Sequence, residues 1–298
     1  MKNFSDFTSI IRTEIASAFE NAVLNLQTIT KASGSYEGLT VKTDNTGVCP
    51  VLNLTSAYKK YENGTSIDEI IDGFIDMLEN IEKPSIDTEA FRSFEAIRSK
   101  VYPRVINRYS NEEYLSNKPH IDLDDISVMF VVRVMVDANG VAEAIVDDTL
   151  QSVWNVTTSD LMDTAISNIE REEPIFSNIE DMIFGGNGTP STIETATVGE
   201  LAPMFVLTNQ SKTRGANLIL SKKVLDRITA RFGDFYIIPS SIHEVLILPT
   251  STAEELGRDV TDIVEMIKNV NENEVREEER LSEKLYKYTI ETKELATA

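Results

Sequence analysis

Residues 235–249 constrain the fold more than any other stretch, because two apolar runs there flank a pair of serines. Both runs are rich in Ile, Val, Phe and Tyr, residues that favour β-strands. Two such runs in close succession predict a β-hairpin. Ser240 and Ser241 form a two-residue turn less readily than Asn-Gly does, because neither serine takes a positive φ at low cost. A longer loop that begins at Pro239 is therefore the alternative.

The tip of this hairpin gathers four polar residues that are candidate binding residues: Ser240, Ser241, His243 and Glu244. A serine, a histidine and a carboxylate also occur together in hydrolases, where they must contact one another in sequence. Successive side chains of a strand point to opposite faces, so Glu244 cannot orient the ring of His243. No glycine-flanked nucleophile elbow surrounds them. We therefore assign no catalytic residue; the serines should bond main-chain groups of the turn, and His243 a nearby carbonyl.

The length of 298 residues suits one large domain or two closely packed ones. We expect an N-terminal α+β region over 1–125 and a C-terminal α+β region over 126–298. The lone cysteine, Cys49, excludes an internal disulfide bond and a cysteine-rich zinc site. Only two histidines are present, which argues against a histidine-based metal site. We expect neither a metal nor a cofactor.

The formal net charge of −21 argues against nucleic-acid binding, because surfaces that bind nucleic acids are basic. The acidic residues are spread along the chain and mixed with 28 Lys and Arg, which favours a solvated surface over an imitation of a phosphate backbone. No apolar run approaches the roughly 20 residues that a membrane span needs. The N-terminal residues also lack the apolar core of a signal peptide. These features predict a cytoplasmic protein that binds neither membranes nor nucleic acids directly.

The spacing of apolar residues predicts an α+β fold, with antiparallel-rich sheets built from β-hairpins and with helices packed on them. Apolar residues recur with helical spacing over 4–19 and 66–81, and a Ser-x-x-Glu capping box starts the second helix. Residues 127–136 alternate as a long strand, which a glycine turn connects to a second strand over 141–146. The last third of the chain has the order β-β-α-β-β-α. Strands that come in hairpins, with helices after them, indicate antiparallel layers.

Two segments fit more than one structure or motif. Residues 101–108 are compatible with a strand or a helix, although Pro103 disfavours the interior of a helix. Residues 185–200 begin with a glycine-rich stretch, which raises the question of phosphate binding. A P-loop would end in Gly-Lys-Ser or Gly-Lys-Thr before a helix, and this segment does not. We interpret 185–200 as an exposed, mobile loop or linker. Two further strands are expected over 204–209 and 216–220.

Several local patterns together resemble a family of uncharacterised bacterial proteins. The matching pieces include Pro119-His120, Val206-Leu207-Thr208-Asn209, Gly215-Ala216-Asn217 and Pro239-Ser240-Ser241-Ile242-His243-Glu244. The family is known only as a domain of unknown function, frequent in low-GC anaerobes and their mobile elements, so the resemblance implies no activity. It does imply that the hairpin over 239–244 is a shared feature, architectural or functional. Asn209, which ends one of the matching pieces, joins the candidate binding residues.

The sequence leaves three hypotheses for function, of which the first is favoured over any enzyme. The first is a non-enzymatic cytoplasmic protein that binds another macromolecule, most naturally a protein, because the chain shows no convergent catalytic set, metal cluster or nucleotide motif. The second is a small-ligand-binding protein or a hydrolase that uses the hairpin tip from Ser240 to Glu244. The third is an acidic decoy that imitates nucleic acid, such as a counter-defence factor of a phage or mobile element.

Overall fold

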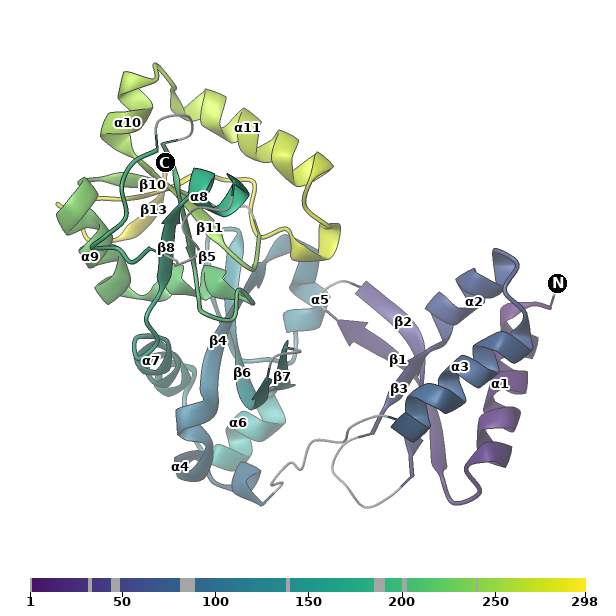
Figure 1. Cartoon of the computed structure of the whole chain (residues 1–298). Coiled ribbons are helices and arrows are strands. Elements are labelled where there is room, and N and C mark those ends of the chain that lie inside the picture. The colour runs from purple at the N-terminus through teal and green to yellow at the C-terminus, as the bar shows by residue number, and fades with distance from the viewer. Residues whose placement is uncertain are drawn as a thin grey trace. The chain divides into compact units, whose positions relative to one another are not determined.

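The computed structural model describes residues 2–31, 34–43, 49–80, 89–137, 140–184, 191–199, 203–239 and 241–298. The chain divides into two compact units, Met1–Glu89 and Ala90–Ala298 (Figure 1). Within the described residues, helices accompany three antiparallel sheets, which confirms the predicted α+β class. The division differs from the boundary expected between residues 125 and 126. Strand β4 (Val101–Asn107) pairs along its length with β6 (Ile126–Asp137), and this pairing joins the two sides of the expected boundary.

In the described part of the N-terminal unit, helices cover one face of an antiparallel sheet with the strand order β1-β2-β3 (Figure 1). Its elements are α1 (Phe4–Ala18), β1 (Val23–Lys31), β2 (Gly34–Lys42), β3 (Val51–Asn53), α2 (Leu54–Glu62) and α3 (Ile67–Asn80). Phe7, Ile11 and Ile15 of α1 share one buried core with Leu39 and Leu52 of the sheet. The apolar stripe predicted over the first helix is therefore the face that covers the sheet.

Helix α3 begins where the sequence predicts a capping box. The main-chain N–H of Glu69 donates to Oγ of Ser66 at 3.2 Å, and the main-chain N–H of Ser66 donates to the Glu69 carboxylate at 3.0 Å. These bonds satisfy two of the donors that a helix start leaves without partners. The hydrogen bond from the Ser66 main chain, followed by that from its hydroxyl, holds the pKa of Glu69 below its ordinary value.

The first sheet of the C-terminal unit has the order β4-β6-β5, and β7 also pairs with β6. The elements of this half are η1 (Ala90–Arg92), α4 (Phe94–Ile97), η2 (Arg98–Lys100), β4, η3 (Tyr109–Asn111), α5 (Glu112–Leu115), β5 (His120–Leu123), β6, β7 (Gly140–Ile145), α6 (Asp148–Trp154) and α7 (Thr158–Ile169). The strand predicted over 127–136 is confirmed as β6. Residues 101–107 form the edge strand β4, where Pro103 is tolerated because an edge residue need not donate on both sides.

The two faces of β6 differ, as its alternation predicts. Phe130 and Val132 lie in a buried core with Trp154 and Leu161 of the covering helices. The opposite face carries Arg133, for which the sequence predicted water or an acidic partner. Arg133 pairs there with Glu172 at 2.6 Å. One face of this sheet is therefore apolar. We call the opposite face, where this ion pair lies beside the buried Met129 and Val131, the polar face.

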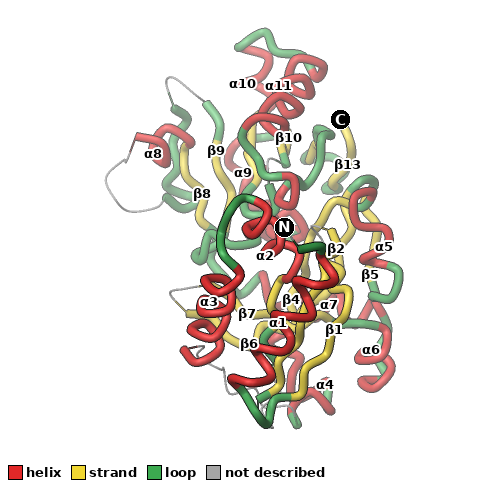
Figure 2. Tube along the Cα trace, turned by 90° about the vertical axis from the view of Figure 1, so that its right-hand side faces the viewer, coloured by secondary structure: helices red, strands yellow, loops and turns green. Residues whose placement is uncertain are grey.

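The second sheet of the C-terminal unit lies between helices, with the order β13-β12-β10-β11-β9-β8. Its elements are β8 (Ile175–Asn178), α8 (Ile179–Phe184), β9 (Phe205–Thr208), η4 (Gly215–Leu220), α9 (Lys222–Phe232), β10 (Phe235–Ile238), β11 (Val245–Pro249), α10 (Thr250–Glu255), α11 (Val260–Asn273), η5 (Glu277–Glu279), β12 (Tyr286–Tyr288) and β13 (Leu295–Thr297). Ile247 packs with Ile228 of α9, whereas Leu248 packs with Ile263 of α11. Helices α10 and α11 follow one another at one end of this unit (Figure 2).

The strand expected over 216–220 is wrong, because this segment forms the short helix η4. The side chain of Asn217 explains the difference. Its Nδ2 donates to the carbonyl oxygen of Pro103 at 2.6 Å, and its Oδ1 accepts from the main-chain N–H of Val105 at 2.9 Å. A buried carboxamide thus takes the place of a neighbouring strand at the outer edge of β4.

The glycine-rich segment expected to be a mobile loop is only partly described. Residues 185–190 and 200 lie outside the described residues. Residues 191–199 are partly packed and partly exposed. Ile193 and Ala196 are buried in the main core of the C-terminal unit, whereas Glu194, Thr195, Thr197 and Val198 are exposed. Elsewhere, none of the helices within the described ranges is both long and apolar enough to cross a membrane.

Candidate functional site

The predicted hairpin exists, with the longer loop that was the alternative to a two-residue turn. Strands β10 and β11 pair from Phe235↔Pro249 to Ile238↔Leu246, so residues 239–244 connect them. Ser241 accepts hydrogen bonds at its Oγ from the main-chain N–H of His243 at 3.0 Å and of Glu244 at 3.4 Å. Ser241 thus holds the loop, as the structural interpretation predicts. Ser240 lies outside the described residues.

His243 has partners other than those expected from the sequence. Its Nδ1 accepts a hydrogen bond from the main-chain N–H of Arg214 at 3.3 Å, whereas a bond to a carbonyl was expected. An accepting nitrogen carries no proton, so the neutral ring holds its proton on Nε2. That nitrogen lies 3.4 Å from the carboxylate of Glu279. The hollow over His243 is wide and open, with a volume of about 320 Å³, and it is also lined by Glu244 and Glu274.

Asn209 acts on the same loop as His243. Its Nδ2 donates to the carbonyl oxygen of Thr213 at 2.8 Å, and its Oδ1 accepts from the main-chain N–H of Thr213 at 3.2 Å. Gly215 is required directly after this loop. A Cβ at that position would lie 2.1 Å from Oγ1 of Thr208 and 2.5 Å from the carbonyl oxygen of His243. Three of the pieces that carry the family resemblance therefore meet here.

These contacts converge on Arg214, which the sequence analysis missed. Arg214 has a φ of 56°, in the left-handed region that residues other than glycine rarely adopt. His243 accepts from the main-chain N–H of Arg214, and Asn209 bonds the main chain of the preceding residue, Thr213. Nε of Arg214 lies 3.1 Å from the carboxylate of Glu143. The signal that could have found it is its place directly before Gly215, the start of a matching piece. Two of the predicted binding residues, His243 and Asn209, thus hold the loop that carries Arg214. Ser241, His243 and Glu244 also line the open hollow.

Arg214 belongs to a charged cluster on the polar face of the first sheet. We call it the arginine cluster and define it as Arg104, Arg133, Glu143, Glu172 and Arg214. Nη1 of Arg104 lies 4.0 Å from the Glu143 oxygen that Arg214 also approaches. The guanidinium carbon of Arg133 lies 3.5 Å from the ring centre of Tyr102, and its Nη1 lies 2.6 Å from Glu172. The arginine side chains are only 13–20% exposed.

The arginine cluster leaves several hydrogen-bond donors unused. Nε of Arg104, Nε of Arg133 and Nη1 of Arg214 are buried and have no partner among the described residues. A buried donor without a partner costs about 1–3 kcal/mol. Burial, followed by repulsion from Arg104, lowers the pKa of the Arg214 guanidinium. The cluster therefore holds positive charge at a cost in stability.

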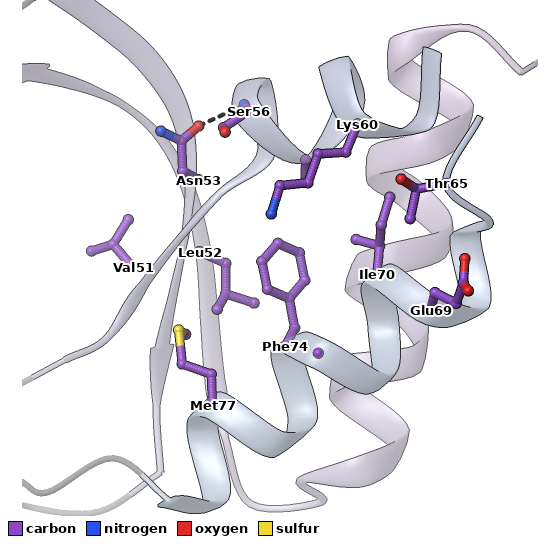
Figure 3. Close-up of a pocket in the computed structure, with 12 residues that line it drawn as sticks. Val51, Leu52, Asn53, Ser56, Lys60, Thr65, Glu69, Ile70, Phe74 and Met77 are labelled. Atoms are coloured by element: carbon purple, nitrogen blue, oxygen red, sulfur yellow. Dashed lines mark hydrogen bonds between the residues drawn. The ribbon is translucent and has the colours of Figure 1, made fainter. Parts of the chain in front are cut away.

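A second candidate site lies in the N-terminal unit, in a groove between β3, α2 and α3 (Figure 3). Its volume is about 440 Å³. Leu52, Phe74 and Met77 supply apolar walls, and Met77 is 40% exposed. The side chain of Lys60 runs from α2 into the space between β3 and the ring of Phe74 (Figure 3). The Lys60 ammonium has no carboxylate partner in the part of the chain that the structure describes.

The sequence belongs to a recognised group. A model of a family of unknown function, DUF5688, matches residues 4–289. The chain belongs to DUF5688. The match confirms the predicted resemblance to an uncharacterised family and covers nearly the whole chain. No curated protein and no solved structure matches it.

The chemistry open to this DUF5688 protein follows from its two candidate sites. The groove of the N-terminal unit offers an ammonium, an apolar wall and a strand edge, which are the groups that hold peptides. The arginine cluster of the C-terminal unit offers guanidinium donors, which are suited to carboxylates and phosphates. Among the described residues, no group of three or more His, Cys, Asp or Glu is placed to hold a metal ion.

Proposed function

We propose that this DUF5688 protein is a binding protein that holds an extended, acidic segment of a partner protein in the groove of its N-terminal unit. The observation that carries the proposal is that the groove runs beside an edge of β3 that pairs with no strand among the described residues, with Lys60 reaching into it. The proposal locates the protein in the cytoplasm of a bacterium, in keeping with its composition and with the family resemblance.

The free edge of β3 supports the addition of a strand. The main-chain N–H of Val41 donates to the carbonyl oxygen of Pro50 at 2.9 Å, so Pro50 faces β2. Main-chain groups alternate in direction along an antiparallel strand, which turns the N–H and C=O of Val51 away from β2. Strand β3 ends the sheet in the described residues. An extended peptide can therefore bond to Val51 and continue the sheet, as in other cases of β-augmentation.

Charge and apolar surface favour a particular kind of segment. Lys60 has no carboxylate partner among the described residues, although the chain has 49 Asp and Glu and only 28 Lys and Arg. A carboxylate supplied by the partner would pair with its ammonium. Phe74 and Met77 line the same groove and would cover an apolar side chain of the segment. The expected ligand thus combines one carboxylate with one apolar residue in an extended conformation.

Gly73 gives independent support for an occupant. It lies in the interior of α3 and lines the groove, and a Cβ built there would meet nothing within 4 Å. A glycine inside a helix costs roughly 0.5–1 kcal/mol relative to alanine. No close neighbour within the described residues requires this glycine. The approach of a ligand main chain to α3 would require it.

Selection from a library of displayed random peptides tests the proposal with the full-length chain. Peptides that bind the wild-type protein are selected, and those that also bind a Gly73→Trp variant are discarded. The introduced indole ring fills the groove from an exposed position, so the fold should remain intact, which circular dichroism verifies. We expect the retained peptides to share a carboxylate and an apolar residue at a fixed spacing.

Two results would count against the groove as the binding site. One is a selection that yields no peptide with affinity for the wild-type chain. The other is a set of peptides that bind the wild-type and Gly73→Trp proteins equally well. A Gly73→Ala variant provides an intermediate case, because its methyl group narrows the groove only where the ligand main chain approaches α3, so it should weaken binding less than Gly73→Trp does.

A further inference from the structure

The arginine cluster of the C-terminal unit carries an excess of positive charge in an acidic protein. Its members are Arg104, Arg133 and Arg214 with Glu143 and Glu172. Three positive and two negative charges leave a net charge of +1, whereas the whole chain has a net charge of −21. Charges that are shielded from water are normally paired. The surplus guanidinium therefore calls for an anion that the described residues do not supply.

The geometry shows where this anion is missing. Nε of Arg214 and Nη1 of Arg104 approach the same oxygen of Glu143, at 3.1 Å and 4.0 Å. One carboxylate oxygen thus serves two cations, and the longer distance exceeds that of a hydrogen bond. Nε of Arg104 and Nη1 of Arg214 have no partner among the described residues. Both side chains remain partly exposed, at 15% and 20%, although these two nitrogens are buried.

We propose that Arg104 and Arg214 bind an oxyanion group of a small molecule, a carboxylate or a phosphate, next to Glu143. Guanidinium groups present several N–H donors in a plane, which matches the oxygens of both groups. The net charge of +1 can be balanced by one negative charge, whereas a nucleic acid brings many phosphates. The ligand is therefore a small molecule with a single oxyanion group at this position.

The surrounding structure holds Arg214 in place for such a role. Its left-handed main chain, with a φ of 56°, is fixed by the hydrogen bond to His243 and by the bonds of Asn209 to Thr213. Strained residues persist only where the neighbouring structure determines them, and they gather at functional sites. His243 and Asn209 are thus positioning residues, because they act on the anion only through Arg214.

Thermal unfolding and calorimetric titration of the full-length chain test the proposal. The probes are inorganic phosphate and oxalate, each compared with sodium chloride at the same ionic strength. We expect one or both probes to raise the melting temperature beyond the effect of the chloride control. The probe that binds more tightly shows whether the site prefers a phosphate or a carboxylate, because phosphate is tetrahedral and a carboxylate is planar. In Arg214→Gln the affinity should fall by about tenfold, which corresponds to the loss of one charged hydrogen bond.

The variant Glu143→Gln separates a binding site from a purely structural ion-pair network. It removes the carboxylate that competes for both arginines, so the affinity for the probe should rise even though the free protein becomes less stable. Because Glu143→Gln should raise the affinity, it still tests the proposal if Arg214→Gln fails to fold. Arg98→Gln, which changes an arginine that is 55% exposed and paired with Glu95, should leave the affinity unchanged.

Three results would overturn the proposal. The first is a melting temperature that responds to phosphate and oxalate no more than to chloride. The second is a response of equal size in the wild-type and Arg214→Gln proteins. The third is a Glu143→Gln variant that folds and yet binds both probes no better than the wild type does.

Discussion

The main-chain N–H of Arg214 donates a hydrogen bond to Nδ1 of His243, which lies 3.3 Å away. This contact connects the hairpin tip, where the sequence predicts candidate binding residues, with the arginine cluster, which the sequence does not reveal. His243 therefore acts on the arginine cluster by holding the main chain of Arg214. The hairpin thus supports a charged group, and its tip also lines the open hollow over His243.

This relationship predicts different results for two substitutions of His243. The variant His243→Leu removes the acceptor and leaves a main-chain donor without a partner, so it should lower the free energy of unfolding by about 1–3 kcal/mol. The variant His243→Asn offers an amide oxygen close to the position of Nδ1 and should retain most of the stability. Denaturation in urea measures both. Equal losses of stability in the two variants would show that the hydrogen bond to Arg214 does not account for the contribution of His243.

A second prediction concerns Gly73 in the absence of any ligand. The variant Gly73→Ala should raise the free energy of unfolding of the N-terminal unit by about 0.5–1 kcal/mol, because alanine restricts the unfolded chain and favours a helix. The methyl group would meet no atom within 4 Å, so no clash offsets the gain. Urea denaturation, followed by the circular dichroism of the helices, provides the measurement. A loss of stability would mean that the groove is filled in the free protein.

A third prediction concerns alkaline pH. Burial, followed by the hydrogen bond to Asp226, raises the pKa of Tyr288 from 10.0 to about 12. Because the pKa is higher in the folded state than in the unfolded state, the contribution of Tyr288 to stability is complete below pH 10. It is lost as the pH rises towards 12. The difference in unfolding free energy between the wild type and Tyr288→Phe should therefore shrink over that range. A difference that stays constant with pH would refute this assignment.

A fourth prediction is that the chain does not retain duplex or single-stranded nucleic acid at physiological salt. Several basic residues of the C-terminal unit have partners within the chain. Arg104 faces Glu143 at 4.0 Å, and Arg108 lies 3.2 Å from Asp122. The ammonium of Lys223 donates to the carbonyl oxygen of Glu170. Binding at micromolar concentration in a gel-shift assay, weakening steeply with salt, would contradict the prediction.

Local patterns predicted much of the fold because their causes lie within a few residues. The capping box of Ser66 and Glu69 and the alternation along β6 depend only on near neighbours, and both are present in the structure. Residues 216–220 were interpreted as a strand because an apolar run fits that pattern. The decisive contact is the pairing of Asn217 with the edge of β4 at Val105, which lies 112 residues away in the chain.

The candidate sites could not be predicted from local patterns, because they also depend on contacts between residues that lie far apart in the chain. Arg214 and Glu143 belong to segments that only the folded chain brings together. The pattern identified His243 and Asn209, yet it could not show that both hold the loop that carries Arg214. The groove of the N-terminal unit likewise depends on the angle between α2 and α3 beside β3, which periodicity does not reveal.

The dissociation constant of a selected peptide, measured for Lys60→Glu and for Lys59→Glu, tests the central claim most directly. Both lysines lie in the last turn of α2, and both substitutions change the net charge equally, but only Lys60 lines the groove. We expect Lys60→Glu to weaken binding by at least about tenfold, the effect of losing one close charge pair, and Lys59→Glu to stay within about twofold of the wild type. Equal effects of the two substitutions, or no effect of either, would contradict the assignment of the groove as the binding site.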